Sequence, residues 1–124
     1  MTPVENVVAA YEKLLAHSTS RLALAREGHW AQLAQQEADY LAEVESLKTL
    51  EARYQRAIEG NTAGVRRKAA LIERILKQDR QIQQLAASHR DELRDLMDDS
   101  RHRRDLSKLY SAGAGIPSDN QGLR

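Results

Sequence analysis

Between residues 30 and 58, side chains of one face recur after alternating steps of three and four residues, without a slip. This spacing follows one face of an α-helix and is typical of side chains that interlock with a neighbouring helix. Two of the nine positions are acidic. The face consists of Trp30, Leu33, Glu37, Tyr40, Val44, Leu47, Glu51, Tyr54 and Ile58. The segment therefore predicts a long helix that packs against other helices.

The remaining signals extend this pattern to most of the chain. The only prolines are Pro3 and Pro117, so nothing breaks the interior. Thr2 and Pro3 suit the start of a helix, and Gly28 and Gly60 suit the ends of two helices. We predict an all-α fold: an antiparallel hairpin or bundle of three long helices plus a short C-terminal helix. The bundle covers residues 1–112, with helices at about 3–26, 30–58, 63–97 and 101–112, and residues 113–124 form a flexible tail.

The break before the last helix rests on charge. Asp98 and Asp99 would be unfavourable at a helix C-terminus, whereas they or Ser100 could cap a new helix. We therefore expect a break near residues 98–100, with one continuous helix as the alternative.

Two further helices are expected to bury one side. On the first helix this side is Val4, Val8, Tyr11, Leu15, Leu22 and Ala25, interrupted by Ser18. On the third, Asp79 interrupts a side formed by Val65, Ala69, Ile72, Ile75, Leu76, Ile82, Leu85, Ala86, Leu93, Leu96 and Met97.

Composition excludes several classes of protein. The chain has no cysteine, and with it no disulfide or thiolate chemistry. No apolar run approaches a membrane span, and the N-terminus lacks the features of a signal peptide, so we expect a cytosolic protein. The net charge is +1 overall, but residues 1–60 carry 6 − 9 = −3 and residues 61–124 carry 13 − 9 = +4.

No pattern predicts catalysis, a cofactor or a metal site. The four histidines fall in four different segments, and no Glu has His three residues later, as di-iron bundles require. The basic run from Arg101 to Arg104 is offset by neighbouring aspartates and lacks stacking aromatics, so direct nucleic-acid binding is not expected.

Two features suggest binding of another protein. Glu37, Glu51 and Asp79 interrupt apolar stripes, and they either pair with cations of neighbouring helices or lend polar selectivity to a groove. Near the C-terminus, Leu106, Leu109 and Tyr110 form a strip too small to hold a short helix permanently. Such a helix could cover a groove and yield it to a competitor.

Three segments carry a resemblance to a known family. The first is Gly28-x-Trp30-x-x-Leu33-x-x-x-Glu37-x-x-Tyr40, the second is the helix from Ile72 to Met97, and the third is R-R-D-L-S-K-L-Y at residues 103–110. In order and spacing they resemble the FliT-type flagellar export chaperones.

The resemblance implies a cytoplasmic chaperone that binds the filament-cap protein FliD through a C-terminal segment, prevents its premature assembly and delivers it to the export gate FlhA. Some relatives also inhibit the master regulator FlhDC. It implies that Ile72 contacts the partner and that Tyr110 docks at the gate. We therefore predict these partner-binding residues: Ile72, Ile75, Leu76, Asp79, Ile82, Leu106, Leu109 and Tyr110.

The alternative is a structural coiled-coil or adaptor protein without an export role. A constitutive oligomer with a fully buried third helix would favour it. The sequence leaves the oligomeric state open, and a weak or helix-swapped homodimer is one option.

Overall fold

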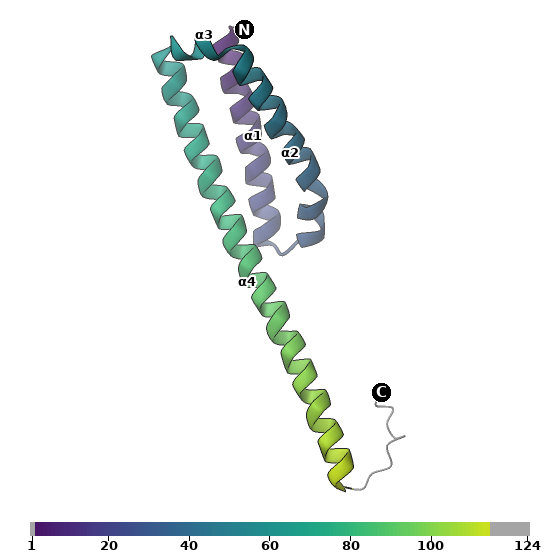
Figure 1. Ribbon diagram of the computed structural model, residues 1–124. Coiled ribbons are helices and arrows are strands. Elements are labelled where there is room, and N and C mark those ends of the chain that lie inside the picture. The colour runs from purple at the N-terminus through teal and green to yellow at the C-terminus, as the bar shows by residue number, and fades with distance from the viewer. Residues whose placement is uncertain (1, 115–124) are drawn as a thin grey trace. The chain divides into compact units, whose positions relative to one another are not determined.

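The computed structural model describes residues 2–114, and within this range the chain is helical with no strand. Four helices follow one another: α1 (Pro3–Arg26), α2 (Trp30–Arg53), α3 (Gln55–Glu59) and α4 (Thr62–Ala114) (Figure 1). The predicted all-α class is confirmed. Most of the predicted tail, residues 115–124, lies outside the described residues, and residues 113 and 114 belong to α4. The chain divides into two units, residues 1–86 and residues 87–124, which are described separately below.

Local chemistry sets both ends of α1. At its start, the Thr2 side chain accepts a hydrogen bond from the Glu5 N–H at 3.1 Å, which satisfies one of the free donors of the first turn. At its end, Gly28 adopts a φ of 77°, the left-handed geometry that glycine tolerates best. The N–H of Gly28 donates to Ala25 O at 3.1 Å and that of His29 to Leu24 O at 2.8 Å. These two bonds form a Schellman motif, so the predicted glycine stop is confirmed.

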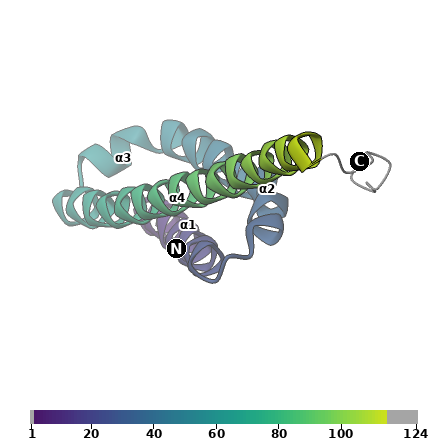
Figure 2. The ribbon, with the colours of Figure 1, turned by 90° about the horizontal axis from the view of Figure 1, so that it is seen from below.

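In the first unit, α1 packs against both α2 and α4. Figures 1 and 2 show it running beside each of them. Its buried residues cover more than the predicted side, because Val7, Leu14, Ser18 and Arg21 are also buried. Ser18 is fully buried, so the polar interruption that the sequence predicted lies inside the core. The helix therefore has two inward faces, one for each neighbour.

The core consists of two apolar clusters. The first joins all four helices and contains Val7, Tyr11, Leu14, Leu15, Tyr40, Leu47, Ile58, Leu71 and Ile75. The second lies beside the turn between α1 and α2 and contains Leu22, Ala25, Leu33 and Ile82, with Trp30 packed against it. Between them in the sequence of each helix fall polar residues: Ser18 and Arg21 on α1, Glu37 on α2 and Asp79 on α4. A polar layer thus separates the two clusters.

The inward face of α4 differs from the predicted one. Leu71, which the sequence stripe omitted, is fully buried, and Ile75 and Ile82 are buried with it. Val65 and Leu76 were expected to be buried, but they are 42% and 51% exposed. The error arose because a dense apolar pattern admits two overlapping faces, and only packing against α1 decides between them.

Close approach of two helices explains the glycine in the first turn of α4. A Cβ atom added at Gly64 would lie 2.5 Å from Val4 Cγ1, so the start of α4 passes directly against the start of α1. Asn61 caps this start, because its Oδ1 accepts the Gly64 N–H at 2.8 Å.

The predicted helix at 30–58 is divided in two. Tyr54, with φ −111° and ψ 20°, leaves helical geometry and separates α2 from α3. Neither glycine nor proline marks this position, so the spacing could not reveal it. The kink keeps Tyr54 packed against the first cluster and Ile58 buried within it.

In the second unit, the predicted break at residues 98–100 is absent, and α4 continues to Ala114. No glycine or proline occurs between Gly64 and Gly113. Instead of capping a new helix, Asp99 pairs with Arg103 one turn later at 2.8 Å, which supports a continuous helix. The expected burial of Leu93, Leu96 and Met97 is also wrong, because these side chains are 47–65% exposed.

Candidate partner-binding groove

An open groove lies between α2 and α4, with α1 as its floor. Its volume is about 640 Å³. Within the described residues it is lined by Tyr11, Leu14 and Arg21 of α1, by Glu37, Tyr40, Leu41, Val44, Leu47, Lys48 and Glu51 of α2, and by Ile72, Ile75, Leu76, Asp79 and Gln83 of α4. Every lining residue belongs to the first unit.

The middle of the groove is aliphatic. Leu41 on the α2 side is 54% exposed and Leu76 on the α4 side is 51% exposed, while Val44 and Ile72 are half-buried between them. Covering such side chains releases apolar surface from water, at about 25 cal/mol for each Å². The middle of the groove therefore favours an aliphatic partner surface.

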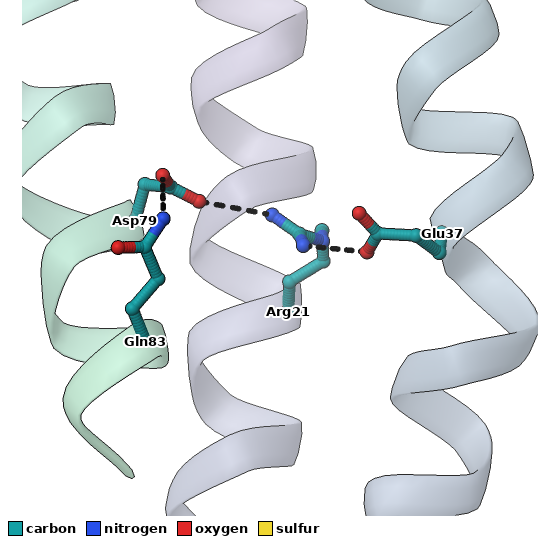
Figure 3. A network of polar contacts seen from close by, with 4 residues as sticks. All are labelled: Arg21, Glu37, Asp79 and Gln83. Atoms are coloured by element: carbon teal, nitrogen blue, oxygen red, sulfur yellow. Dashed lines mark hydrogen bonds and ion pairs between the residues drawn. The ribbon is translucent and has the colours of Figure 1, made fainter. Parts of the chain in front are cut away.

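One end of the groove is a charged network centred on Arg21. This side chain is only 5% exposed, and its Nη2 donates to Glu37 Oε2 at 2.7 Å (Figure 3). Its Nη1 lies 3.9 Å from Asp79 Oδ1, which is an ion pair but too long for a hydrogen bond. Asp79 in turn accepts a hydrogen bond from Gln83 Nε2 at 3.0 Å. One buried cation thus joins three helices through two carboxylates.

Aromatic side chains complete this polar layer. The Arg21 guanidinium lies 4.1 Å from the centroid of the Tyr40 ring, a cation–π contact. His17 meets the same ring edge to face at 5.3 Å and pairs with Glu43 at 2.8 Å. Burial raises the pKa of Tyr40 above 10.0, and the nearby Arg21 charge opposes that shift. The layer therefore holds Arg21 in a fixed position under the groove.

The other end is held by Glu51. The Tyr11 hydroxyl donates a hydrogen bond to Glu51 Oε2 at 2.6 Å, and Lys68 forms an ion pair with Oε1 of the same carboxylate. Burial raises the pKa of Tyr11. Two cations in the first turns of α4 each form an ion pair with another helix. Lys68 pairs with Glu51 of α2, and its neighbour Arg67 pairs with Glu12 of α1. All three carboxylates that interrupt the apolar stripes thus have cationic partners and also line the groove.

The structure brings together half of the predicted partner-binding residues. Ile72, Ile75, Leu76 and Asp79 line the groove, whereas Ile82 is buried in the second apolar cluster. Leu106, Leu109 and Tyr110 belong to the second unit and are 52%, 70% and 73% exposed.

The predicted partner-binding residues included none of the α1 residues and none of the aliphatic α2 residues that line the groove. Leu41 follows Tyr40 and lies just outside the regular stripe. Its place beside that stripe was the sequence signal that could have identified it as a groove residue. Arg21 continues the helical spacing of Leu14 and Ser18, which places it on a buried face.

Across residues 2–114, every helix is too polar or too short to form a membrane span. In the same part of the chain, no group of three histidine, aspartate or glutamate side chains could hold a metal ion.

In the first unit, long packed helices thus form an all-α bundle with an open groove between α2 and α4. The family described as flagellar protein FliT matches residues 8–112, and the chain belongs to this family. Its members are flagellar export chaperones, and that is the role the family assigns to this chain. None of the curated proteins compared with the chain matches it.

Proposed function

We propose that this chaperone binds a C-terminal segment of the filament-cap protein FliD in the groove between α2 and α4, in the cytoplasm, and prevents its premature assembly. The observation that carries the proposal is the pair of half-exposed leucines, Leu41 and Leu76, on opposite sides of an aliphatic groove. An amphipathic client helix would cover both leucines, as in other helix-in-groove complexes.

The membership of the FliT family favours this function over a structural coiled-coil or adaptor role. In the first unit, one side of α4 is exposed, which agrees with that preference. A structural adaptor in which α4, the predicted third long helix, was fully buried would leave no such groove.

The test introduces a charge at a groove position where it should weaken client binding without unfolding the bundle. Because Leu76 is already 51% exposed, Leu76→Asp should leave the bundle folded and lower the affinity for a FliD C-terminal segment at least tenfold, about 1.4 kcal/mol. Leu96→Asp makes the same change on the same helix, at a side chain 65% exposed that does not line the groove. Calorimetry should show normal binding for Leu96→Asp. Equal binding by the two variants would contradict the groove as the client site.

For delivery to the export gate, we propose that Tyr110 docks on FlhA. Its ring is 73% exposed, and an exposed tyrosine offers a flat apolar surface with a hydroxyl at its edge. Tyr110→Ala should weaken binding to the cytoplasmic domain of FlhA by tenfold or more and leave FliD binding intact, whereas Leu96→Ala should change neither. Unchanged FlhA affinity for Tyr110→Ala would refute this role.

From membership of the FliT family alone, we also propose that the chaperone inhibits the regulator FlhDC. A weak homodimer remains a separate proposal, which sedimentation of the full chain over a range of concentrations would test.

A further inference from the structure

Arg21 carries more hydrogen-bond donors than the bundle satisfies. A guanidinium has five N–H groups and no acceptor. Nη2 donates to Glu37 Oε2 at 2.7 Å, but Nε and Nη1 are buried and have no acceptor among the described residues. Of the described residues that line the groove, Arg21 alone has buried polar atoms without a hydrogen-bond partner. Because such donors are rare in folded proteins, these two nitrogens point to an acceptor that a partner supplies.

The same layer also holds acceptors that lack donors. Glu37 Oε1 accepts no hydrogen bond from the described part of the chain, and Asp79 Oδ1 lies 3.9 Å from Arg21 Nη1, beyond hydrogen-bond distance. Both carboxylates line the groove, and 48% of Glu37 and 37% of Asp79 are exposed. A client that covers them with apolar atoms alone would leave them desolvated and unpaired, which is unfavourable. The client must therefore bring a donor as well as an acceptor to this layer.

The other charged residues that line the groove have partners of their own. Lys48 pairs with Glu45 at 3.2 Å, and Glu51 pairs with Lys68. The network around Arg21 is thus the level of the groove at which polar groups still need partners.

The donor and the acceptor are held in place by their neighbours. The Tyr40 ring covers one face of the guanidinium at 4.1 Å, and Glu37 holds one of its edges. Gln83 donates to Asp79 Oδ2 at 3.0 Å, so Oδ1 is the oxygen left for another donor. Figure 3 shows Arg21 Nη1 and this oxygen facing each other between α1 and α4. A donor and an acceptor therefore lie side by side on the α4 side of the groove.

A carboxamide matches such a pair best. An ammonium group donates but cannot accept, a carboxylate accepts but cannot donate, and an aliphatic group does neither. Serine and threonine hydroxyls do both, but these side chains are short, whereas the guanidinium lies at the floor of the groove. A carboxamide has a carbonyl oxygen and an N–H on the same edge, which is how it reads the neighbouring donor and acceptor of an adenine base.

We propose that the network around Arg21 recognises the side-chain carboxamide of a glutamine on the apolar face of the client helix. The carbonyl accepts a hydrogen bond from Arg21 Nη1, and the amide nitrogen donates to Asp79 Oδ1. Since Nη1 is itself buried, the carbonyl reaches it as the Asp79 carboxylate turns aside from its long contact. This inference rests on the proposed function, because it requires a client helix in the groove.

The position of this glutamine follows from the spacing of the groove residues. Glu37 and Leu41 are 41 − 37 = 4 residues apart on α2, and Leu76 and Asp79 are 79 − 76 = 3 residues apart on α4. The network therefore lies one helical turn from the exposed leucines. The client should carry the glutamine one turn away from the aliphatic side chain that covers those leucines.

A substitution scan of a client-like helix tests the recognition. The probe is a hydrocarbon-stapled helix of about four turns with a leucine stripe, and each stripe position is replaced in turn by glutamine, methionine, glutamate or lysine. Methionine matches glutamine in size without its hydrogen bonds, glutamate keeps the shape but only accepts, and lysine only donates. Fluorescence polarisation measures the affinity of each probe for the full-length chain.

At one stripe position, glutamine should bind about tenfold more tightly than methionine, glutamate or lysine, because it forms hydrogen bonds to two charged groups. Equal affinities of glutamine and methionine at every position overturn the inference. So does a preference for lysine or glutamate over glutamine at the position that tolerates polar side chains.

Variants of the chain locate the preference. Asp79→Ala removes one of the two contacts and should reduce the preference for glutamine over methionine to about threefold or less. Asp39→Ala makes the same change at an exposed position on α2 that does not line the groove, and it should retain the tenfold preference. An undiminished preference in Asp79→Ala, with matching melting curves, contradicts the inference. Should Asp79→Ala melt early, the scan on the unmodified chain still decides.

The failure of the recognition can be separated from the failure of the proposed function. If the leucine probe binds and Leu76→Asp abolishes that binding, but no position prefers glutamine, only the recognition is refuted. If neither the probe nor the FliD segment binds, both proposals fall.

Discussion

Helix α4 buries its large apolar side chains in one stretch and exposes them in another. In the first unit, α4 buries Leu71, Ile75 and Ile82 to 8% exposure or less. In the second unit, six large apolar side chains on the same helix are 47–73% exposed. Apolar content therefore does not account for the difference.

The arrangement of these side chains around the helix does account for it. At 3.6 residues per turn, Leu71, Ile75 and Ile82 fall within about 40° of the circumference and form one line that a neighbouring helix can cover. In the second unit, Leu93, Leu96 and Met97 lie on one side, and Leu106, Leu109 and Tyr110 lie roughly opposite. Two short patches on opposite sides cannot form a single seam, so they suit two separate contacts better than one core.

Charge is also arranged differently in the second unit. Residues 90–99 carry 2 − 5 = −3 and residues 100–109 carry 4 − 1 = +3. Pairs such as Asp99–Arg103 give the helix local support. Local interactions of this kind sustain helicity weakly, whereas the first unit has a packed core.

The largest expected difference is in hydrogen exchange. Amides of residues 71–82 should open only with the whole bundle, at a free energy typical of small domains, roughly 5 kcal/mol or more. Amides of residues 93–110 should open at less than about 2 kcal/mol, because no packed side chain in that stretch opposes opening. Exchange followed by mass spectrometry or NMR measures both. Equal protection in the two stretches would break the comparison.

A matched pair of truncations should show the next largest difference. Leu71→Ala removes a fully buried side chain and should lower the free energy of unfolding by about 2–5 kcal/mol. Leu96→Ala makes the same change at a side chain that is 65% exposed and should cost less than about 0.5 kcal/mol. Urea unfolding of the two variants gives the values. A cost above 1 kcal/mol for Leu96→Ala would mean that this side chain has a partner in solution.

These contrasts also show what the sequence can predict. The stripe over residues 30–58 was correct, because eight of its nine positions are buried or half-buried, and only Glu37 is exposed. The caps at Thr2 and Gly28 were correct because they depend only on neighbouring residues.

Predictions that depended on tertiary contacts fared worse. Leu71 was missed and Leu76 was misplaced because the orientation of α4 is set by α1, which no local pattern encodes. The same holds for the groove: Asp79 was recognised, but Arg21, its partner on α1, was not. The break near residue 98 was predicted from capping residues alone, although the pairing of Asp99 with Arg103 in the next turn supports a continuous helix.

A smaller effect is expected where α4 begins. Gly64→Ala should destabilise the bundle by about 1–2 kcal/mol, because the clash with Val4 outweighs the helix propensity gained. Gly60→Ala is the control, since a Cβ there would meet its nearest neighbour at an ordinary 3.6 Å. Val4→Ala should restore much of the loss in the Gly64→Ala background. A stabilising effect of Gly64→Ala alone would show that the two helix starts can separate.

The smallest effect distinguishes two tyrosines, Tyr40 in the bundle and Tyr110 in the second unit. Burial raises the pKa of Tyr40 above 10.0, so above pH 10 the unfolded chain releases a proton that the folded chain retains. The folded state then binds more protons than the unfolded state, and stability must fall as pH rises through this range. Its contribution is fully present below pH 10.

Tyr40→Phe removes this contribution. The decline in unfolding free energy between pH 10 and pH 11 should therefore be shallower than in the unmodified chain, by at most about 1.4 kcal/mol per pH unit. Tyr110→Phe, at a side chain 73% exposed, is the matched control. Because lysines also titrate in this range, the meaningful quantity is the difference between each variant and the unmodified chain, measured by urea unfolding. Identical slopes for Tyr40→Phe and the unmodified chain would show that Tyr40 ionises as readily in the fold as outside it, and that the polar layer around Arg21 is open to water.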